Sequence, residues 1–382
     1  MARHYLDNAS TVPLRPEAVI ALRDWLEVGA ADPGRLHQEG RVVRIGIETA
    51  REQVADLLGA QPRQVVFTAS GTEAINAAVW GATRARPGAV VLCAAVEHSA
   101  VRDASARAAP NETLPVDGRG RIELDGLDAA LARHASSRPA LVHCQWANHE
   151  VGTVQPVREV VVRCREAGVP VHVDAASACG HLPTDLEELG ADLVSVSAHK
   201  LGGPAGVGAL WIRPGLRIEP LLVGGQQERA RRAGFENAAA IVSFGAAAAA
   251  LSADHGARLA AEALADRRLV GDLLAAATAV DGVALVGDPD PDGRVPHIVC
   301  LGVAGVEAEP VVIGLDKAGI AVHSGSACSS ESLEPSPVLV AMGVDASRSL
   351  RLSVGWANTD ADVAAFGRAF QEVVEGLRSL RA

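Results

Sequence analysis

The chain has 382 residues, of which 48% are hydrophobic and 21% are charged, and its formal net charge at pH 7 is −11. A chain of this length and apolar content can bury a substantial core, so we expect one large and one smaller folded domain. The acidic balance argues against direct nucleic-acid binding, because tight non-specific binding requires a basic surface that displaces counterions.

The N-terminal sequence and the cysteine spacing bear on location and on metal binding. Residues 1–7 lack the apolar centre of a signal peptide, and the chain has no apolar run long and uncharged enough to span a bilayer. We therefore expect a cytoplasmic protein that does not enter a membrane. The six cysteines stand singly, without a spacing typical of zinc, which indicates neither a disulfide framework nor a structural metal site.

Short β-branched runs alternate with alanine-rich amphipathic segments in the first half of the chain. The alternation indicates βαβ units and therefore an α/β fold with a largely parallel sheet. The runs that we expect to form strands are residues 65–67, 89–93, 140–144, 169–173 and 193–196.

A change of pattern in the second half predicts the domain organisation. Residues 246–276 are rich in alanine and leucine and predict a long helix that forms a spine between the domains. A second α+β set follows, with strands at 297–303, 320–323 and 349–354 and helices at 309–318 and 361–380. We expect a large domain over 15–258 and a small domain formed by 1–14 and 259–382.

Small and hydroxyl residues follow the first predicted strand, in the sequence Thr68-Ala69-Ser70-Gly71-Thr72. Such a sequence can open a helix whose backbone N–H groups and positive dipole end bind a phosphate. A capped helix of purely structural meaning has the same composition, and it is the more common meaning of this pattern alone.

Asp174 ends the strand predicted at 169–173, so its carboxylate should reach the same edge of the sheet. A carboxylate there could pair with the nitrogen of a pyridinium ring. The alternative is a helix N-cap, since the residues after Asp174 could begin a helix.

Only two lysines occur in the chain, Lys200 and Lys317, and almost every other cation is arginine. A lysine amine can condense with a carbonyl, whereas an arginine guanidinium cannot, so Lys200 is a candidate for a Schiff base. The alternative of a solvated surface lysine suits Lys317 better, because Lys200 follows a strand end where α/β sheets bind ligands. An amine, a carboxylate and a phosphate-binding helix at three strand ends would together form a pyridoxal phosphate site.

Cys328 differs from the other cysteines because glycine and serine surround it at 324–330. Such neighbours predict an exposed loop, where a thiol is either a hazard or a reactive group, and we favour the reactive group. Cys179 fits either reading. Apolar or amphipathic surroundings indicate inert packing for the remaining four, which are Cys93, Cys144, Cys164 and Cys300.

Taken in order, the motifs of this chain resemble those of the cysteine desulfurases of the bacterial NifS/IscS-like group, which are fold-type I pyridoxal phosphate enzymes. The matching segments span nearly the whole chain and are residues 5–11, 151–156, 197–200, 324–328, 332–336 and 350–353. The resemblance implies a mostly parallel sheet with helices on both faces and a smaller α+β domain. It also implies a homodimer in which each active site is completed by the other subunit.

The resemblance further implies roles for individual residues. Lys200 would hold pyridoxal 5'-phosphate and Asp174 would bond its ring nitrogen, while His98 would stack on the ring. Binding of the phosphate would fall to Gly71, Thr72, Ser197 and His199. The substrate carboxylate would be received by Arg351, whose planar guanidinium suits that task, with Asn148 and His149 nearby.

Three positions depart from the family pattern. His149 stands where the family has an asparagine near the substrate carboxylate and the ring hydroxyl. Ser177 stands where a glutamine commonly reaches the ring oxygen, and its shorter side chain would need a water to do so. Phe235 replaces a threonine that reaches the phosphate in the partner subunit, and it cannot donate that hydrogen bond.

By this resemblance the chain converts L-cysteine to L-alanine and leaves the sulfur as a persulfide on Cys328. The persulfide would pass to an acceptor protein for iron–sulfur assembly, tRNA thiolation or DNA phosphorothioation. Two alternatives remain open: a selenocysteine lyase or cysteine sulfinate desulfinase, and a non-catalytic scaffold that keeps the fold. The arginines at 229, 231 and 232 would contact a partner protein or the second subunit of the dimer. The more common meaning of such a run is a solvated, charged surface.

Overall fold

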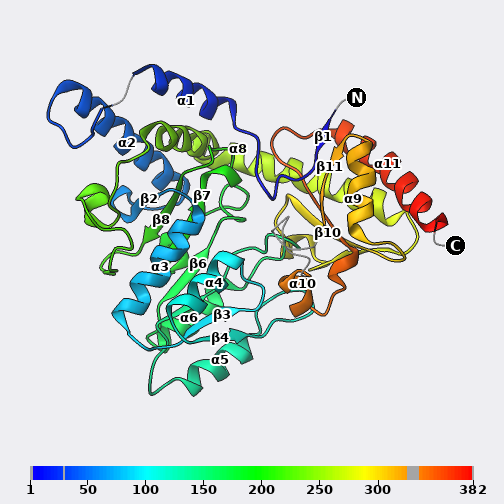
Figure 1. Ribbon diagram of the computed structural model, residues 1–382, viewed down its shortest axis with the longest axis horizontal. Helices are drawn as coiled ribbons and strands as arrows, with labels where there is room; N and C mark the ends of the chain where they lie inside the picture. The colour runs from blue at the N-terminus through cyan, green and yellow to red at the C-terminus, as the bar shows by residue number, and fades with distance from the viewer. Residues whose placement is uncertain (1–2, 29–30, 325–334, 381–382) are drawn as a thin grey trace.

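The computed structural model describes residues 3–28, 31–324 and 335–380, and a seven-stranded sheet forms its larger part (Figure 1). The strand order is β2-β8-β7-β6-β5-β3-β4. The strands are β2 (Val65–Thr68), β3 (Val91–Ala94), β4 (Asn111–Leu114), β5 (Leu141–His143), β6 (Val171–Asp174), β7 (Leu193–Ser197) and β8 (Gly208–Ile212).

The sheet is mostly parallel, as predicted, and β8 alone among its strands runs against the others. Neighbours from β7 through β6, β5 and β3 to β4 pair in parallel, while β8 pairs antiparallel with both β7 and β2. Strands β4 and β8 were not among the predicted runs. The connection from Ser197 to Gly208 is too short for a crossover helix, so β8 returns antiparallel.

Helices cover both faces of this sheet, and alternate strand residues point to opposite faces. Val66 packs with α3 (Gly71–Ala85) and α4 (Ser99–Ala108) in one buried apolar cluster. Val65 and Phe67 contribute to a second cluster on the other face. Helices that contribute to that second cluster include α2 (Gln38–Leu57), α5 (Leu124–Arg133), α6 (Val157–Glu166), α7 (Leu186–Leu189) and the first part of α8 (Ala238–Thr278).

Helix α8 extends further in both directions than the predicted helix at 246–276, and it is interrupted at residues 253–256 by non-helical backbone. Its first part packs against α1 (Pro16–Val28) and α2, and its last part joins the core of the smaller sheet. By length and composition α8 could cross a membrane, which the sequence analysis did not expect of any segment. Half of its most apolar window is buried inside the protein, which is typical of a core helix.

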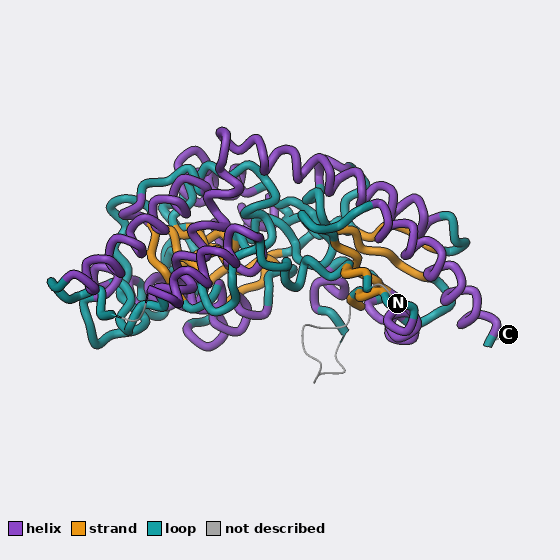
Figure 2. Tube along the Cα trace, turned by 90° about the horizontal axis from the view of Figure 1, so that it is seen from above, coloured by secondary structure: helices purple, strands orange, loops and turns teal. Residues whose placement is uncertain are grey.

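A four-stranded antiparallel sheet, ordered β12-β13-β10-β9, forms the second body, and the orange strands of the two sheets lie apart in Figure 2. Its strands are β9 (Val283–Val286), β10 (Ile298–Val303), β12 (His323–Ser324) and β13 (Ser349–Ser353). The accompanying helices are α9 (Ala308–Lys317), α10 (Pro337–Ala341) and α11 (Asp360–Ser379). The predicted domain boundary at 258 and 259 stays a prediction.

The single strand predicted at 320–323 is wrong. Residues of β11 (Ile320–Ala321) pair in parallel with β1 (His4–Tyr5), whereas β12 pairs with β13 in the larger of the two small sheets. Val322 separates the two strands, so the chain changes sheets within one short apolar run. The pairing with β1 ties the N-terminal residues to the second body.

Candidate functional site

A cavity of about 350 Å³ opens at the carboxyl edge of the parallel strands, where residues from both sheets meet. The seven-stranded sheet and its connections supply most of the lining, while His323 and Arg351 come from β12 and β13. The lining includes the predicted residues Gly71, Thr72, His98, His149, Asp174, Ser177, Ser197, His199, Lys200 and Arg351. Of the predicted site residues that the structure describes, it therefore brings together all except Asn148.

One end of the cavity is formed by the start of α3. Ser70 caps this helix, since its Oγ accepts a hydrogen bond from the Glu73 N–H at 3.1 Å. A Cβ added to Gly71 would lie 3.2 Å from the Ser197 Cβ, so glycine lets the helix approach the end of β7 closely. The helix is thus both capped and open to the cavity, and its N-terminal N–H groups can bind a phosphate.

Asp174 ends β6, and its carboxylate is held in place from two sides. Its Oδ1 accepts hydrogen bonds from the Ser195 Oγ at 3.1 Å and from the Ala176 N–H at 3.0 Å. The residues after Asp174 form a turn and not the helix that the N-cap alternative required. An oriented carboxylate at this edge can pair with a ring nitrogen.

Lys200 ends the short 3-10 turn that follows β7, and it lines the cavity. The Nζ donates a hydrogen bond to the backbone oxygen of Ala9. The backbone oxygen of Lys200 lies 3.0 Å from the Nε2 of the buried His181. By contrast, Lys317 is exposed at the end of α9, as predicted.

Two uncharged imidazoles form one wall of the cavity. The Nδ1 of His98 accepts a hydrogen bond from the Ala100 N–H at 3.1 Å, which places the proton of the neutral ring on Nε2. The ring centres of His98 and His149 are 5.0 Å apart in an edge-to-face contact. Burial lowers the pKa of both residues, most strongly that of His149, so neither ring carries a charge near neutral pH.

Arg351 lies on β13, and its buried guanidinium is fixed by three hydrogen bonds. One NH2 group donates to the Asp7 Oδ1 at 2.7 Å and to the Ser10 Oγ at 2.8 Å, while NH1 donates to the backbone oxygen of His149 at 2.9 Å. Asp7 was not predicted as the partner of Arg351, although it lies in the segment 5–11 of the matching motifs.

Asn148 does not line the cavity, so its predicted place beside the substrate stays a prediction. Its side-chain oxygen accepts hydrogen bonds from the N–H groups of Glu150 and Val151, at 2.8 and 2.9 Å. Its side-chain nitrogen donates to the backbone oxygen of Val96 at 3.2 Å. These bonds hold the backbone turn that presents His149.

Cys328 lies outside the described residues. All five of the other cysteines are buried, which confirms the prediction of inert packing and assigns Cys179 to the same group. Burial raises the pKa of the thiols to about 12 for Cys93, Cys164, Cys179 and Cys300, and raises that of Cys144 as well. These thiols are therefore poor nucleophiles near neutral pH.

Glu97 is a site residue that sequence reasoning missed. Its side chain is only 1% exposed, and its Oε1 accepts a hydrogen bond from the N–H of Gln145, which lines the cavity, at 2.7 Å. Burial and then the nearby charge of Asp174 raise the pKa of the Glu97 carboxyl to about 8. Glu97 is therefore mostly protonated near neutral pH, beside the cofactor-binding edge.

We expect the stability of the variant Glu97→Gln, relative to that of the wild type, to increase as the pH rises. The carboxyl keeps its proton up to about pH 8 when folded but releases it near its ordinary pKa of 4.5 when unfolded. Between these values each pH unit costs the wild type about 1.4 kcal/mol of stability, a loss that glutamine avoids. The Tm of the variant, relative to wild type, should rise by about 4 to 5 °C between pH 5 and 8.

Calorimetry of the cofactor-free full-length protein provides the measurement, and the exposed Glu166→Gln is the matched control. That control should show no such trend. A Tm difference for Glu97→Gln that does not change with pH would contradict the protonated state.

Comparison with known proteins gives consistent matches over the whole chain. The family model for class-V aminotransferases matches residues 4–366. A cysteine desulfurase of Cereibacter sphaeroides is 39% identical over 100% of this chain and 98% of its own length. The structure of a NifS-like protein from Rickettsia africae superposes with a TM-score of 0.87 at 28% identity, covering 98% of this chain and 99% of the other. A protein named SspA, solved in complex with cysteine, matches at TM-score 0.77 and 25% identity, covering 92% and 99%.

Proposed function

The chain belongs to the class-V aminotransferase family as a pyridoxal-phosphate-dependent cysteine desulfurase, and we propose from this premise that it transfers sulfur from L-cysteine to Cys328. The observation that carries the proposal is the single cavity lined by Lys200, Asp174 and Arg351. In the net reaction, L-cysteine and the Cys328 thiol give L-alanine and a Cys328 persulfide, so atoms and electrons balance without an external oxidant. The persulfide then passes to an acceptor protein.

The side chains of the cavity fit pyridoxal 5'-phosphate at each of its polar ends. Lys200 offers an amine to the aldehyde, Asp174 offers a carboxylate to the ring nitrogen, and the start of α3 offers N–H groups to the phosphate. Ser197 and His199 join the phosphate end, while His98 and Ser177 line the ring. When bound, the cofactor supplies an electron sink for the carbon next to the amino group of the substrate.

In this proposal Lys200 carries out a proton transfer and Cys328 carries out the sulfur transfer. The Lys200 amine takes the α-proton of the bound cysteine. The Cys328 thiolate then attacks the substrate sulfur and forms the S–S bond as the Cβ–S bond breaks. The electron pair of the broken bond stays with Cβ, which takes up a proton equivalent to the one that the thiol released.

Arg351 binds the substrate carboxylate in this proposal. Asp7 and His149 fix the guanidinium in position, which reduces the entropy lost when the substrate binds. The neutral ring of His149 lies beside His98, and its N–H can donate a hydrogen bond to the same carboxylate.

We expect Arg351→Lys to raise the KM for L-cysteine by about 10- to 100-fold, because a charged hydrogen bond to the carboxylate is lost. The planar guanidinium can donate hydrogen bonds to His149, to Asp7 and to a substrate carboxylate at the same time, whereas the ammonium group of lysine lacks this planar geometry. Initial rates of alanine formation give the KM, and the absorbance of the bound cofactor should stay unchanged. An unaltered KM would exclude Arg351 as the carboxylate ligand.

The function is tested by one turnover of the purified, cofactor-loaded wild type with stoichiometric L-cysteine. Alanine and an alkylation-trapped persulfide should appear in equal amounts, with the extra sulfur on the peptide that contains Cys328. A protein that binds the cofactor but forms no alanine would support the scaffold alternative. Rapid release of alanine from L-selenocysteine without a persulfide intermediate would support the lyase alternative.

We also propose a homodimer in the cytoplasm. Large apolar side chains are exposed on α1, α2, the connection between them and the segment before α8, among them Leu26, Leu36, Ile45, Val223 and Phe235. Such a surface is suited to burial against a second copy. A reducing compartment would keep the Cys328 thiol free. Light scattering tests the dimer, and a monomer would count against it.

A further inference from the structure

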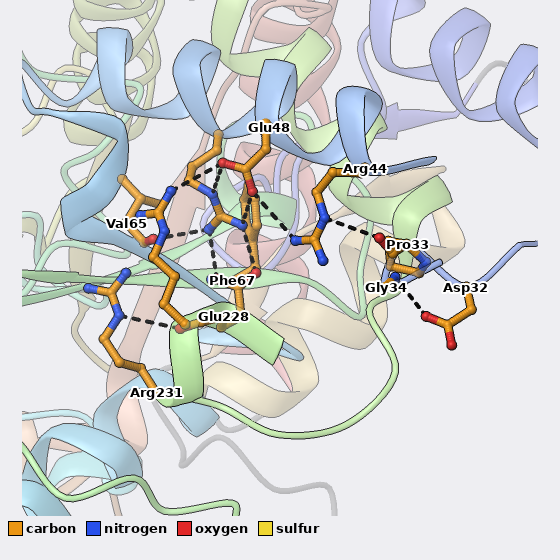
Figure 3. A network of polar contacts seen from close by, with 11 residues as sticks. Asp32, Pro33, Gly34, Arg44, Glu48, Val65, Phe67, Glu228 and Arg231 are labelled. Carbon is orange, nitrogen blue, oxygen red and sulfur yellow. Dashed lines mark hydrogen bonds and ion pairs between the residues drawn. The ribbon is translucent and has the colours of Figure 1, made fainter. Parts of the chain in front are cut away.

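The segment between β8 and α8 contains a turn with unusual backbone geometry. Glu228, Arg229 and Ala230 have φ angles of 48°, 58° and 61°, in the left-handed region that residues other than glycine seldom adopt. Three such residues in succession persist only where the surroundings hold them. Figure 3 shows the polar contacts that surround this turn.

Glu228 is held by a buried ion pair with Arg51 of α2. Its two carboxylate oxygens lie 2.6 and 2.7 Å from the two terminal nitrogens of Arg51, and both side chains are almost fully buried. Arg51 also contacts Glu48 on its own helix at 3.2 Å. Burial of a charged pair is favoured only when such hydrogen bonds satisfy both groups.

The same ion pair satisfies the open edge of β2. Strand β2 is at the end of the sheet, and on its inner side it pairs with β8. On its outer side, the Phe67 N–H donates to the Glu228 Oε2 at 2.9 Å, and the Val65 oxygen accepts from the Arg51 NH1 at 3.0 Å. Arg51 and Glu228 thus take the place that a further strand would occupy.

A second ion pair joins this turn to the start of α3. The Arg232 guanidinium lies 2.8 and 3.2 Å from the two oxygens of Glu73. Glu73 also accepts a hydrogen bond from the Ala69 N–H at 2.9 Å. The two pairs therefore hold both ends of the connection 67–73, and the cavity-lining residues Ser70, Gly71 and Thr72 lie between them.

We propose that Arg51 and Glu228 are positioning residues for the phosphate end of the cofactor. They act through the backbone of residues 65–73, since neither residue lines the cavity. The inference rests on the proposed phosphate site at the start of α3. It predicts that loss of the pair weakens the recognition of the phosphate group specifically, whereas a purely structural pair would affect stability alone.

The test compares the binding of pyridoxal 5'-phosphate with that of pyridoxal, which lacks the phosphate. Cofactor-free full-length wild type and Glu228→Gln are titrated with each compound, and the absorbance of the bound form gives the dissociation constants. We expect the variant to bind pyridoxal 5'-phosphate about tenfold or more weakly, while its affinity for pyridoxal stays unchanged.

Asp288→Asn is the matched control, because Asp288 is a buried carboxylate whose Oδ2 lies 2.7 Å from an Arg121 nitrogen outside the cavity lining. Loss of this charge should lower the Tm but leave the preference for the phosphorylated compound intact. If Glu228→Gln lowers the Tm and also keeps that preference, the inference is wrong while the proposed function stands.

Two further outcomes are decisive. A wild type that binds pyridoxal as tightly as its phosphate would overturn the phosphate site itself and the inference with it. Should Glu228→Gln not fold, Arg232→Gln removes the second ion pair at a less buried position, and the same selective loss is expected. An unchanged preference in that variant would overturn the inference.

Discussion

Replacement of Lys200 by alanine is expected to abolish covalent attachment of the cofactor and to lower alanine formation by about 10⁴-fold or more. The loss should be this large because one amine both attaches the cofactor and takes the α-proton of the substrate. No second amine is available in the cavity, since the only other lysine is exposed at the end of α9.

Because the chain has only two lysines, a single control variant covers the other lysine side chain. Lys317→Ala is the matched control, because it removes the other lysine of the chain and should leave cofactor binding and turnover unchanged. Borohydride reduction followed by peptide mass spectrometry should find the cofactor only on the peptide that contains Lys200. Attachment of the cofactor to Lys317, or normal turnover by Lys200→Ala, would contradict the assignment.

Replacement of Cys328 by serine is expected to lower alanine formation from L-cysteine by about 10³-fold or more while the cofactor stays bound. The five other thiols are buried with raised pKa values and offer no substitute nucleophile. The measurements are the alanine yield, the trapped persulfide and the absorbance of the bound cofactor.

Cys93→Ala is the control for loss of a thiol as such, since Cys93 is buried in β3. That variant should keep both the persulfide and the rate. If Cys328→Ser forms alanine from L-cysteine at the wild-type rate, Cys328 is not the nucleophile. If it loses activity toward L-cysteine but keeps activity toward L-selenocysteine, the lyase alternative gains support.

The residues that local pattern could identify are those at strand ends. Asp174 and Lys200 each follow an apolar run, and Gly71 follows another, so the convergence of parallel strands predicts that they meet. The structure places all three in one cavity. The prediction from single elements succeeded here because each residue is positioned by its own strand, and the parallel sheet brings the strand ends together at one edge.

The residues that sequence reasoning missed depend on partners far away in the chain. Asp7 meets Arg351 across 344 positions, and Glu228 meets Arg51 across 177. A local sequence pattern cannot predict ion pairs between residues so far apart in the chain. Glu97 was missed for a related reason, because its raised pKa arises from burial and from Asp174. The hydrogen bonds that the Asn148 side chain accepts from the backbone of its own turn were likewise not visible in the sequence.

Arg351 comes from β13, whereas Lys200 and Asp174 come from the ends of β7 and β6, in the other sheet. In the proposed function, one sheet therefore supplies the group that binds the substrate carboxylate, and the other supplies the groups that bind the cofactor. Substitutions around β12 and β13 should therefore change the affinity for the substrate while the affinity for the cofactor is preserved.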